Sequence, residues 1–509
     1  MKFSPKIRTL ALFTAAMLSL AGCATDDDIS QTDPNLALTP GETLISLSDN
    51  AVLVEGEPVS QSSTVSVYEG ADIIYYEAGR GEGYGEGTTA DEHTAQEADA
   101  HTVLTITSPG TYRATGTLSQ GQLVVDLGQE ARENPEARVT LILDDVDLTC
   151  TVAPAILVKN AYECGSAQIE TATHQVDTGD AGFTLVLADD SENVVSGSYV
   201  AKIYEPGTTD KLYKYDAAIE SLVSFNIDGE SLGNGILTVN AQNEGIESHL
   251  HLTINAGDIT IFSKDDSINA NEDFVSVLTV NGGHLQCTVS GGSEGDGLDS
   301  NGYIVINGGH IIAAADPNSQ DSGLDSDLGI YLNGGTVLAS GNMYDEISSD
   351  STQPYAVMQL RELREGGALT LMQDEQGEAV AAFAPVNDYT VLVYSDPSLQ
   401  ANANYSFWAV STVTGSQYAS LYTDITAFEN AQQLETSAAG RPGGARPSAQ
   451  QGGPGAMQPP EGETPPEGAP SFDTEPPQRP SGDDRPEAPS TQGEGTVPSE
   501  QTPIDNQTT

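Results

Sequence analysis

Four hexapeptides decide the fold: LTINAG (252–257), LTVNGG (278–283), IVINGG (304–309) and IYLNGG (330–335). Their asparagines stand at a constant step of 26 residues, at positions 255, 281, 307 and 333. A fixed period of this length indicates a solenoid, in which each repeat stacks on the next.

Apolar residues alternate around each of these asparagines, which is typical of a strand and not of a helix. They precede each Asn by three residues and by one residue, and the alternation resumes after the Gly pair. The first rung shows the pattern with Leu252, Ile254, Ile259 and Ile261. The sequence therefore predicts an all-β protein, a right-handed parallel β-helix with rungs about 4.8 Å apart. The handedness is taken from the general rule for parallel crossovers.

The asparagine column has two structural interpretations. Stacked side-chain amides can form a hydrogen-bonded ladder along the coil. Alternatively, Asn supplies the turn conformation before Gly. Neither interpretation implies catalysis.

The N-terminus combines Lys2, Lys6 and Arg8 with an apolar stretch from Leu10 to Leu20 and the tetrapeptide LAGC, which ends at Cys23. The apolar run is too short to span a bilayer, so it predicts a secretory signal. By its resemblance to bacterial lipoproteins, Cys23 is the expected lipidated residue. The chain is then anchored by lipid in the bacterial cell envelope, outside the cytoplasm. The alternative is an ordinary cleaved signal with an incidental cysteine.

Composition divides the rest of the chain into regions. A solenoid needs a cap over its exposed end, so the strands after the last repeat are expected to form one. The polar tail has too few apolar residues to fold. The predicted regions are a signal peptide (1–22), a tether (23–48), N-terminal strands with an acidic loop (49–101), the parallel β-helix (102–350), a β-rich C-terminal cap (351–428) and a disordered acidic, Pro/Gly-rich tail (429–509).

The formal net charge of −57 makes nucleic acid an improbable partner and cations natural ones. A monomer is expected. Of the cysteines after Cys23, Cys287 occupies an inward column and is expected to be buried. Whether Cys150 and Cys164 form a disulfide is left open.

An acidic motif recurs once per rung, as EGIES (244–248), DSINA (266–270), DGLDS (296–300) and SGLDS (322–326). Carboxylates stacked at rung spacing repel by roughly 3–4 kcal/mol at an effective dielectric constant near 20, so a bound cation would stabilise them. Clustered oxygen ligands favour Ca²⁺. The predicted calcium ligands are Asp265, Asp266, Asn269, Asp296, Asp299, Asp321 and Asp325. The alternative is that these are solvated carboxylates of tight turns.

The run from Ala217 to Gly341, in which these motifs lead to NAG or NGG turns, resembles a bacterial carbohydrate-binding domain family. The resemblance extends over about Leu104 to Tyr355. It implies a calcium-binding parallel β-helix with a pectate-lyase-like fold that binds plant polysaccharides such as cellulose or pectin without cleaving them. The chain departs from the family pattern at ESLVSFNI (220–227) and at His249, which puts metal binding at those rungs in doubt.

Three functions remain open. In a polysaccharide-binding protein, Tyr303 and Tyr331 should face outward and offer a platform for sugar rings. In a calcium-dependent polysaccharide lyase, Lys264 would be the base, because it is the only Lys or Arg between Leu222 and Met343. In a surface adhesin, calcium would only stiffen the coil.

Overall fold

The computed structural model describes residues 38–59, 67–70, 95–204 and 211–437, which belong to one compact unit. The predicted all-β class is confirmed, since the described helical segments are short: α1 (Ala95–Asp99), η1 (Gln129–Glu133) and η2 (Ile169–Thr171). None of the described helices is long and apolar enough to cross a membrane. The predicted signal peptide and the lipidation site at Cys23 lie outside the described residues.

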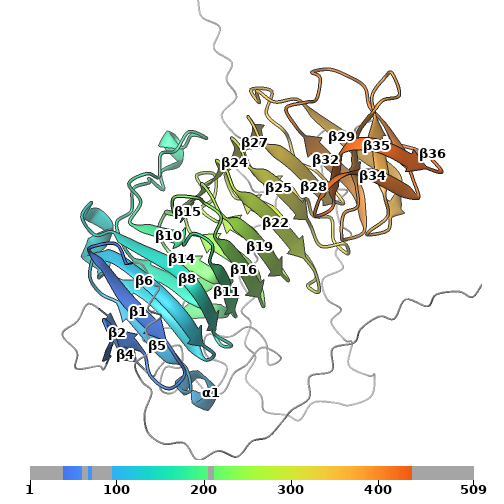
Figure 1. Cartoon of the computed structure of the whole chain (residues 1–509). Helices are drawn as coiled ribbons and strands as arrows, with labels where there is room; N and C mark the ends of the chain where they lie inside the picture. The colour runs from blue at the N-terminus through green and yellow to red at the C-terminus, as the bar shows by residue number, and fades with distance from the viewer. Residues whose placement is uncertain (1–37, 60–66, 71–94, 205–210, 438–509) are drawn as a thin grey trace, which may run out of the picture. The chain divides into compact units, whose positions relative to one another are not determined.

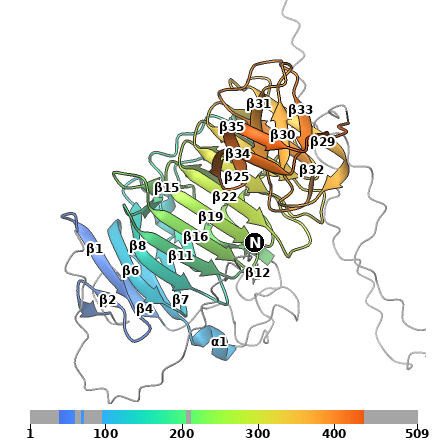
Figure 2. The same ribbon diagram turned by 45° about the vertical axis from the view of Figure 1, so that its right-hand side comes forward.

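The central strands stack in columns of parallel neighbours (Figure 1). The first column contains β10 (Phe183–Leu187), β15 (Phe225–Gly229), β18 (His251–Ile254), β21 (Val277–Val280), β24 (Tyr303–Ile306) and β27 (Gly329–Leu332). The second contains β11 (Glu192–Gly197), β16 (Ile236–Ala241), β19 (Asp258–Ser263), β22 (His284–Val289), β25 (His310–Ala314) and β28 (Thr336–Gly341), most of them side by side in Figure 2. The third contains β5 (Thr102–Ile106), β7 (Gly121–Asp126), β9 (Ile156–Asn160), β14 (Ala217–Ser221), β17 (Glu244–Ser248), β20 (Ile268–Ala270), β23 (Leu298–Ser300) and β26 (Leu324–Ser326), with the antiparallel β4 (Val67–Gly70) at its edge.

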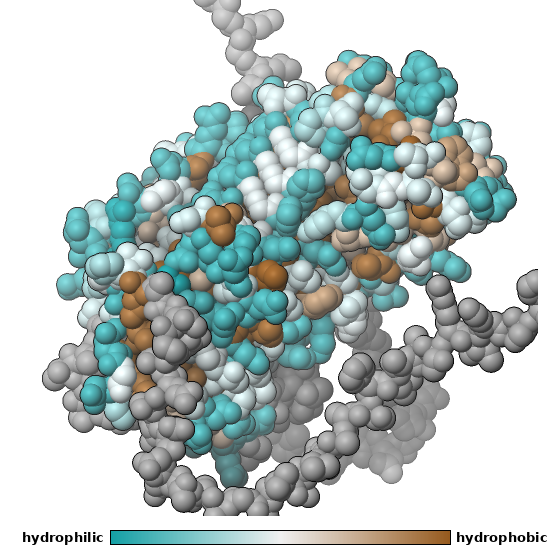
Figure 3. Space-filling model, in the orientation of Figure 1, coloured by the Kyte–Doolittle hydropathy of each residue, from teal (hydrophilic) through white to brown (hydrophobic). Residues whose placement is uncertain are grey.

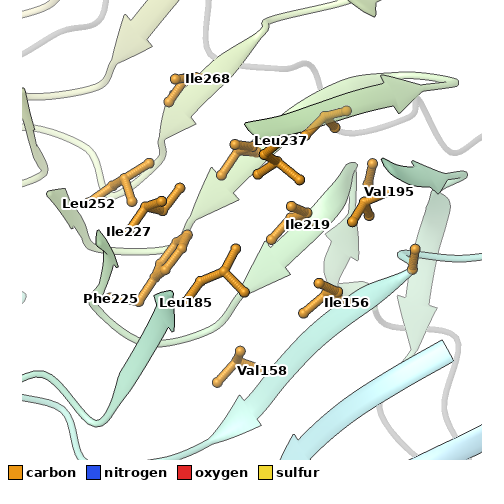
Figure 4. Close-up of a cluster of buried hydrophobic side chains, with 14 of the residues drawn as sticks. Ile156, Val158, Leu185, Val195, Ile219, Phe225, Ile227, Leu237, Leu252 and Ile268 are labelled. Atoms are coloured by element: carbon orange, nitrogen blue, oxygen red, sulfur yellow. The ribbon is translucent and has the colours of Figure 1, made fainter. Parts of the chain in front are cut away.

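The predicted 26-residue register is confirmed. Leu252 pairs with Leu278, which pairs in turn with Ile304 and then Ile330. These side chains are buried, as are the corresponding residues of the other two columns. Each fully buried Leu or Ile contributes about 1.5–3 kcal/mol through the hydrophobic effect. Figure 4 shows such residues, including Leu185, Ile219 and Leu237, converging from different columns.

The asparagines form the hydrogen-bonded ladder. The Nδ2 group of Asn281 donates to Oδ1 of Asn255 at 2.8 Å, and the same bond links Asn307 to Asn281 at 2.9 Å and Asn333 to Asn307 at 3.0 Å. The glycine two residues after Asn281 provides the turn, because Gly283 has a φ of 81°. A Cβ there would lie 2.7 Å from the carbonyl oxygen of Gly257, so this position requires glycine.

Longer strands begin the stack. β8 (Val139–Thr149) pairs with both β10 and β11, and β6 (Gly110–Leu118) lies beside it. β1 (Glu42–Leu47), which falls within the predicted tether, pairs in parallel with β6. The short strands β2 (Leu53–Val54) and β3 (Glu57–Pro58) follow β1 as antiparallel neighbours.

An insertion and a cap complete the described fold. The antiparallel hairpin of β12 (Val200–Tyr204) and β13 (Lys211–Tyr215) interrupts the stack before β14. The cap is antiparallel: β29 (Tyr355–Arg364), β30 (Thr370–Gln373), β31 (Ala379–Phe383), β32 (Tyr389–Ser395), β33 (Ser406–Ala409), β34 (Thr412–Tyr418), β35 (Leu421–Glu429) and β36 (Gln432–Gln433). β32 pairs with β28 and so covers the last rung. β36 lies inside the predicted tail, yet it pairs with β33.

The cysteines after Cys23 are free in the structure. Cys150 is buried, Cys164 is partly exposed, and the two form no disulfide. Cys287 is buried, as its place in an inward column predicts, and it pairs in register with Ala313.

Candidate functional site

The third column carries a continuous row of polar side chains. Glu220, Glu247, Asn269, Asp299 and Asp325 pair in register from β14 to β26. The prediction that the acidic motifs stack from rung to rung is confirmed, since Glu247, Asn269, Asp299 and Asp325 each come from one of the four motifs. Glu220 extends the row by one rung, and the sequence analysis missed it because this copy of the motif follows the inserted hairpin and stands 27 residues before Glu247, off the 26-residue period.

Three of the predicted ligands connect one rung to another. Oδ1 of Asp266 accepts a hydrogen bond from the backbone N–H of Asp296 at 2.6 Å, and Oδ1 of Asp296 accepts one from the N–H of Ser322 at 2.6 Å. Oδ2 of Asp321 accepts the N–H of Gly295 at 2.6 Å. One oxygen of each carboxylate is therefore engaged in holding adjacent turns together.

The carboxyl groups along this row resist ionisation. Burial and the neighbouring Asp299 raise the pKa of Asp266 well above its usual range, and burial together with Asp325 does the same to the pKa of Asp296. Burial and Asp327 raise the pKa of Asp299 to about 7. Burial and a hydrogen bond with Asp345 raise the pKa of Asp325 to about 10. This is the electrostatic signature of crowded carboxylates that lack positive partners.

Asp265 lies beside the row. Burial and Glu294 raise the pKa of Asp265 to about 6. The side chain lines a separate cavity that is described below.

The tightest acidic cluster lies one rung before the predicted ligands. Asp216, Glu244 and Glu247 bring carboxylate oxygens within 4.8 Å of one another, and Glu220, Glu247 and His249 do the same with a ring nitrogen included. Within the described part of the chain, none of the seven predicted ligands belongs to such a group of three acidic, His or Cys side chains. We call these five residues, Asp216, Glu220, Glu244, Glu247 and His249, the glutamate cluster.

Several buried oxygens at this cluster have no hydrogen-bond partner: Oε2 of Glu244, Oε2 of Glu247 and Oδ1 of Asn269. All three side chains are at least nine-tenths buried. Their other polar atoms are engaged, since Nδ2 of Asn269 donates to Oε1 of Glu244 at 3.4 Å, and Nδ2 of Asn271 donates to Oε1 of Glu247 at 2.5 Å. A buried oxygen without a donor is costly, so this arrangement favours a cation.

Two basic side chains contact the carboxylates of the glutamate cluster: Lys214, from outside it, and the cluster's own His249. Lys214 forms an ion pair with Asp216, and Nε2 of His249 lies 2.9 Å from Oε1 of Glu220 and 3.8 Å from Oε1 of Glu247. Burial lowers the pKa of His249, although Glu247 opposes the shift. Burial and the neighbouring Glu247 raise the pKa of Glu244, and burial and Glu220 raise the pKa of Glu247. The nearby basic groups therefore do not compensate the central pair.

The donor atoms of the glutamate cluster indicate which ions it suits. Asp216, Glu244 and Asn269 offer hard oxygen ligands, which Ca²⁺ prefers. The subset with His249 has a nitrogen donor, which transition metals accept more readily than Ca²⁺ does.

The two predicted platform tyrosines lie together, but a histidine covers one of them. The rings of Tyr303 and Tyr331 are 6.1 Å apart in a T-shaped contact. His174 stacks on Tyr331 with ring centroids 4.0 Å apart and an interplanar angle of 12°. The loop that carries His174 is fixed to β18 nearby, because Oγ1 of Thr178 donates a hydrogen bond to Oγ1 of Thr253 at 2.6 Å. One face of Tyr331 is thus occupied by the protein itself.

Lys264 lines a polar cavity of about 630 Å³ between the second and third columns. Its Nζ donates to Oε1 of Gln242 at 2.9 Å. The face of the molecule in Figure 3 is mainly hydrophilic, and its apolar side chains form small groups and not one continuous patch.

Comparison with known proteins identifies the family of this chain. The family of carbohydrate-binding domain-containing proteins matches residues 100–359, just over half of the chain. The chain belongs to this family. The match covers all three columns and the start of the cap, and it confirms the resemblance predicted from the acidic motifs.

Individual relatives are more distant. A carbohydrate-binding domain-containing protein of Acetivibrio thermocellus is 31% identical over 157 residues, which is 31% of this chain and 43% of the relative. The chain therefore spans less than half the length of that curated relative. A solved polysaccharide lyase-like protein from C. thermocellum, a gadolinium derivative, is 20% identical, covers 58% of this chain and 90% of its own, and superimposes with a TM-score of 0.37.

Proposed function

We propose that this chain binds polysaccharide at the bacterial cell envelope through a calcium-loaded, right-handed parallel β-helix, without cleaving the glycan. Family membership over residues 100–359 supports carbohydrate binding. The parallel columns in 26-residue register support the helical coil. Plant cell-wall polysaccharide, pectin or cellulose, is the glycan class that the family resemblance implies.

The calcium part of the proposal depends on one observation: Glu244, Glu247 and Asn269 hold buried oxygens that accept no hydrogen bond. Two carboxylates about 4.8 Å apart repel by roughly 3–4 kcal/mol at an effective dielectric constant near 20. A divalent cation would convert this repulsion into attraction and would satisfy the free oxygens. Asp216 lies within the same group of ligand atoms.

Further ions would bind along the same row. Asp299 and Asp325 continue the row, and Asp266 and Asp296 lie beside it. Burial raises the pKa of each of these carboxyl groups, and neighbouring carboxylates raise it further. Asp265 and Asp321 flank it and, with Asn269, complete the set of seven ligands proposed from the sequence. In this arrangement calcium stiffens the coil by offsetting the charge of its buried carboxylates.

The test is binding of the natural chain to cellulose and to polygalacturonate, each with calcium and with EDTA. We expect binding of at least one of the two polysaccharides that weakens in EDTA. Glu247→Gln should weaken it in calcium as well, whereas Glu192→Gln, on the exposed start of β11, should not. Equal binding with calcium and with EDTA would contradict the calcium role.

The lyase and the adhesin are distinguishable alternatives. A lyase acting through Lys264 would produce unsaturated uronates, visible as rising ultraviolet absorbance on incubation with polygalacturonate. Binding without that absorbance supports our proposal. An adhesin with purely structural calcium would bind neither polysaccharide, yet its melting temperature would still respond to EDTA.

The envelope location is proposed from the sequence of the N-terminus. Metabolic labelling with a radioactive fatty acid should mark the chain in its source cell type, and Cys23→Ser should abolish the label. Retention of the label in the Cys23→Ser variant would contradict lipidation at that cysteine.

A further inference from the structure

We infer that the cavity beside Lys264 is the sugar-binding subsite, and that it takes a neutral, hydroxyl-rich glycan. We call it the Lys264 cavity. The inference rests on the proposed polysaccharide binding and names its site and its ligand class. It moves the expected contact away from Tyr303 and Tyr331, where His174 already covers one ring.

The Lys264 cavity is built where successive parallel strands end. Its lining residues lie at or just after the ends of β8, β11, β16, β19 and β22, so each rung adds a short segment to the same wall: Thr149–Thr151, Ser196–Tyr199, Asn240 with Gln242 and Asn243, Lys264–Asp265, and Gly292–Glu294. A wall that repeats with the rungs suits a ligand that also repeats along one axis. Its volume of about 630 Å³ lies within the range of small-molecule sites.

The side chains offer both donors and acceptors. Asn240 donates to Oγ of Ser196 at 3.2 Å, and Lys264 donates to Oε1 of Gln242 at 2.9 Å, so neighbouring rungs fix one another's side chains. Each amide keeps further donor and acceptor capacity. Sugar hydroxyl groups, which donate and accept at once, match such a lining.

The charge of the cavity favours a neutral sugar. Lys264 is opposed by Asp265 and Glu294 in the same lining, and the chain as a whole carries a formal charge of −57. A uronate carboxylate would meet net repulsion there, whereas a neutral ring would not. Lys264, bonded to an amide and not to a carboxylate, then serves as a hydrogen-bond donor to a hydroxyl.

Close backbone approach shapes the wall. A Cβ at Gly292 would lie 1.7 Å from the carbonyl oxygen of Lys264, and one at Gly197 would lie 2.5 Å from Cα of Ala218. Side chains at these positions would force the turns apart. The cavity therefore depends on glycines that keep the rungs in contact at its floor.

The experiment measures binding of cellohexaose, a neutral probe, and of polygalacturonate to the full chain by calorimetry at one calcium concentration. Ser293→Trp fills the mouth of the cavity from an exposed loop position and should weaken cellohexaose binding by about tenfold or more. Ser231→Trp, exposed in the turn that leads into the opposite end of β16, is the matched control and should leave it unchanged.

A charge-matched pair tests Lys264 itself. Lys264→Gln should weaken cellohexaose binding by about tenfold, whereas Arg361→Gln, which removes an exposed positive charge from the cap, should not. Melting temperatures of all four variants report whether each is folded.

The outcomes separate this inference from the proposed function. If the natural chain binds cellohexaose and Ser293→Trp binds it equally well, the site is wrong and the function stands. If Ser293→Trp weakens polygalacturonate binding and the natural chain ignores cellohexaose, the neutral ligand class is wrong. If the natural chain binds neither probe nor insoluble cellulose, the proposed function itself fails.

Discussion

Two buried acidic regions of this protein differ in whether the protein itself supplies a positive partner for their carboxylates. Near the start of the stack, Arg113 is surrounded by Glu42 at 2.9 Å, Asp144 at 2.9 Å and Glu230 at 2.5 Å. Burial raises the pKa of Glu42, but hydrogen bonds from Arg113 and from Thr39, together with the positive charge of Arg113, hold it below its usual range. In the glutamate cluster, burial and neighbouring carboxylates raise the pKa values of Glu244 and Glu247.

The difference shows which charges the fold balances by itself. Arg113 supplies donors to three carboxylates at once, as a planar guanidinium does well. Lys214 and His249 each engage the edge of the glutamate cluster, and they leave oxygens of Glu244 and Glu247 without partners. The first region is balanced by the protein's own guanidinium, and the second is the place where we propose a cation.

Removing the guanidinium of Arg113 should change the stability of the protein more than any other substitution considered below. Arg113→Met leaves three carboxylates without their partner, so the free energy of unfolding should fall by about 3–5 kcal/mol. Denaturation with guanidinium chloride measures it. Arg361→Met, an exposed arginine on the cap, should change stability by less than about 0.5 kcal/mol. A loss below about 1 kcal/mol for Arg113→Met would show that the network is not structurally important.

Removing a charge from the glutamate cluster should have the opposite sign. In EDTA near neutral pH, Glu247→Gln should raise the free energy of unfolding by about 1–3 kcal/mol. The raised pKa of Glu247 means that folding carries the cost of protonating or burying its carboxylate, and an amide has no such cost. In calcium the same variant should be less stabilised by the metal than the natural chain is. Calorimetry in both conditions checks this. Destabilisation in EDTA would mean that Glu247 already has a positive partner.

The pH dependence of stability should separate the two regions further. Burial raises the pKa of Glu220 to about 8, so its contribution to stability is present below the unfolded carboxyl pKa and is lost as pH rises through about 7 to 8. Asp299, with a pKa raised to about 7, acts in the same direction. In EDTA the melting temperature should therefore fall between about pH 5 and pH 8.5 by roughly 5 °C, and calcium should reduce the fall.

Glu42 should behave in the reverse manner. Its lowered pKa contributes stability that is present above the unfolded carboxyl pKa and is lost as pH falls. A melting temperature in EDTA that stays constant or rises between about pH 5 and pH 8.5 would contradict the assignment of the glutamate cluster.

The asparagine ladder stacks side chains from rung to rung without charge, so its stability contribution can be compared with that of the acidic rows. Asn281→Ala removes bonds to both Asn255 and Asn307 and should cost about 0.5–1.5 kcal/mol, because the ladder is exposed. Asn281→Asp should cost more at neutral pH, where it also loses its donor. Asn50→Ala, on the surface after β1, is the control. Equal stability of Asn281→Ala and the natural chain would mean that the ladder hydrogen bonds do not stabilise the protein and that these asparagines serve only the turn.

Much of the rung geometry was predictable because parallel stacking copies one pattern. The residues before Asn255, Asn281, Asn307 and Asn333 define a register that the structure reproduces. Of the two interpretations of these asparagines, the amide ladder is confirmed by its hydrogen bonds, and the left-handed turn conformation belongs to the second following glycine.

The glutamate cluster was not among the predicted ligands, because the departures from the family pattern at residues 220–227 and at His249 put metal binding at those rungs in doubt. Glu220 was missed for a further reason. Ile219, Glu220 and Ser221 repeat the IES of residues 246–248, but 27 residues apart, and the interruption before β14 hides this copy. Lys214 comes from the inserted hairpin, and His174 from an irregular loop, where no period exists to place them. The shared IES tripeptide was the signal that could have found Glu220.

Because the asparagine ladder has the same spacing at every rung, whole 26-residue repeats can be added or removed without changing how the remaining rungs stack. Residues 282–307 comprise one complete repeat, and their deletion would bring Asn333 into the place now held by Asn307, above Asn281. The inward columns would close over the gap, with Ile330 resting on Leu278. Duplication or loss of such a segment is therefore a simple route by which related chains could acquire longer or shorter binding surfaces without redesigning either end.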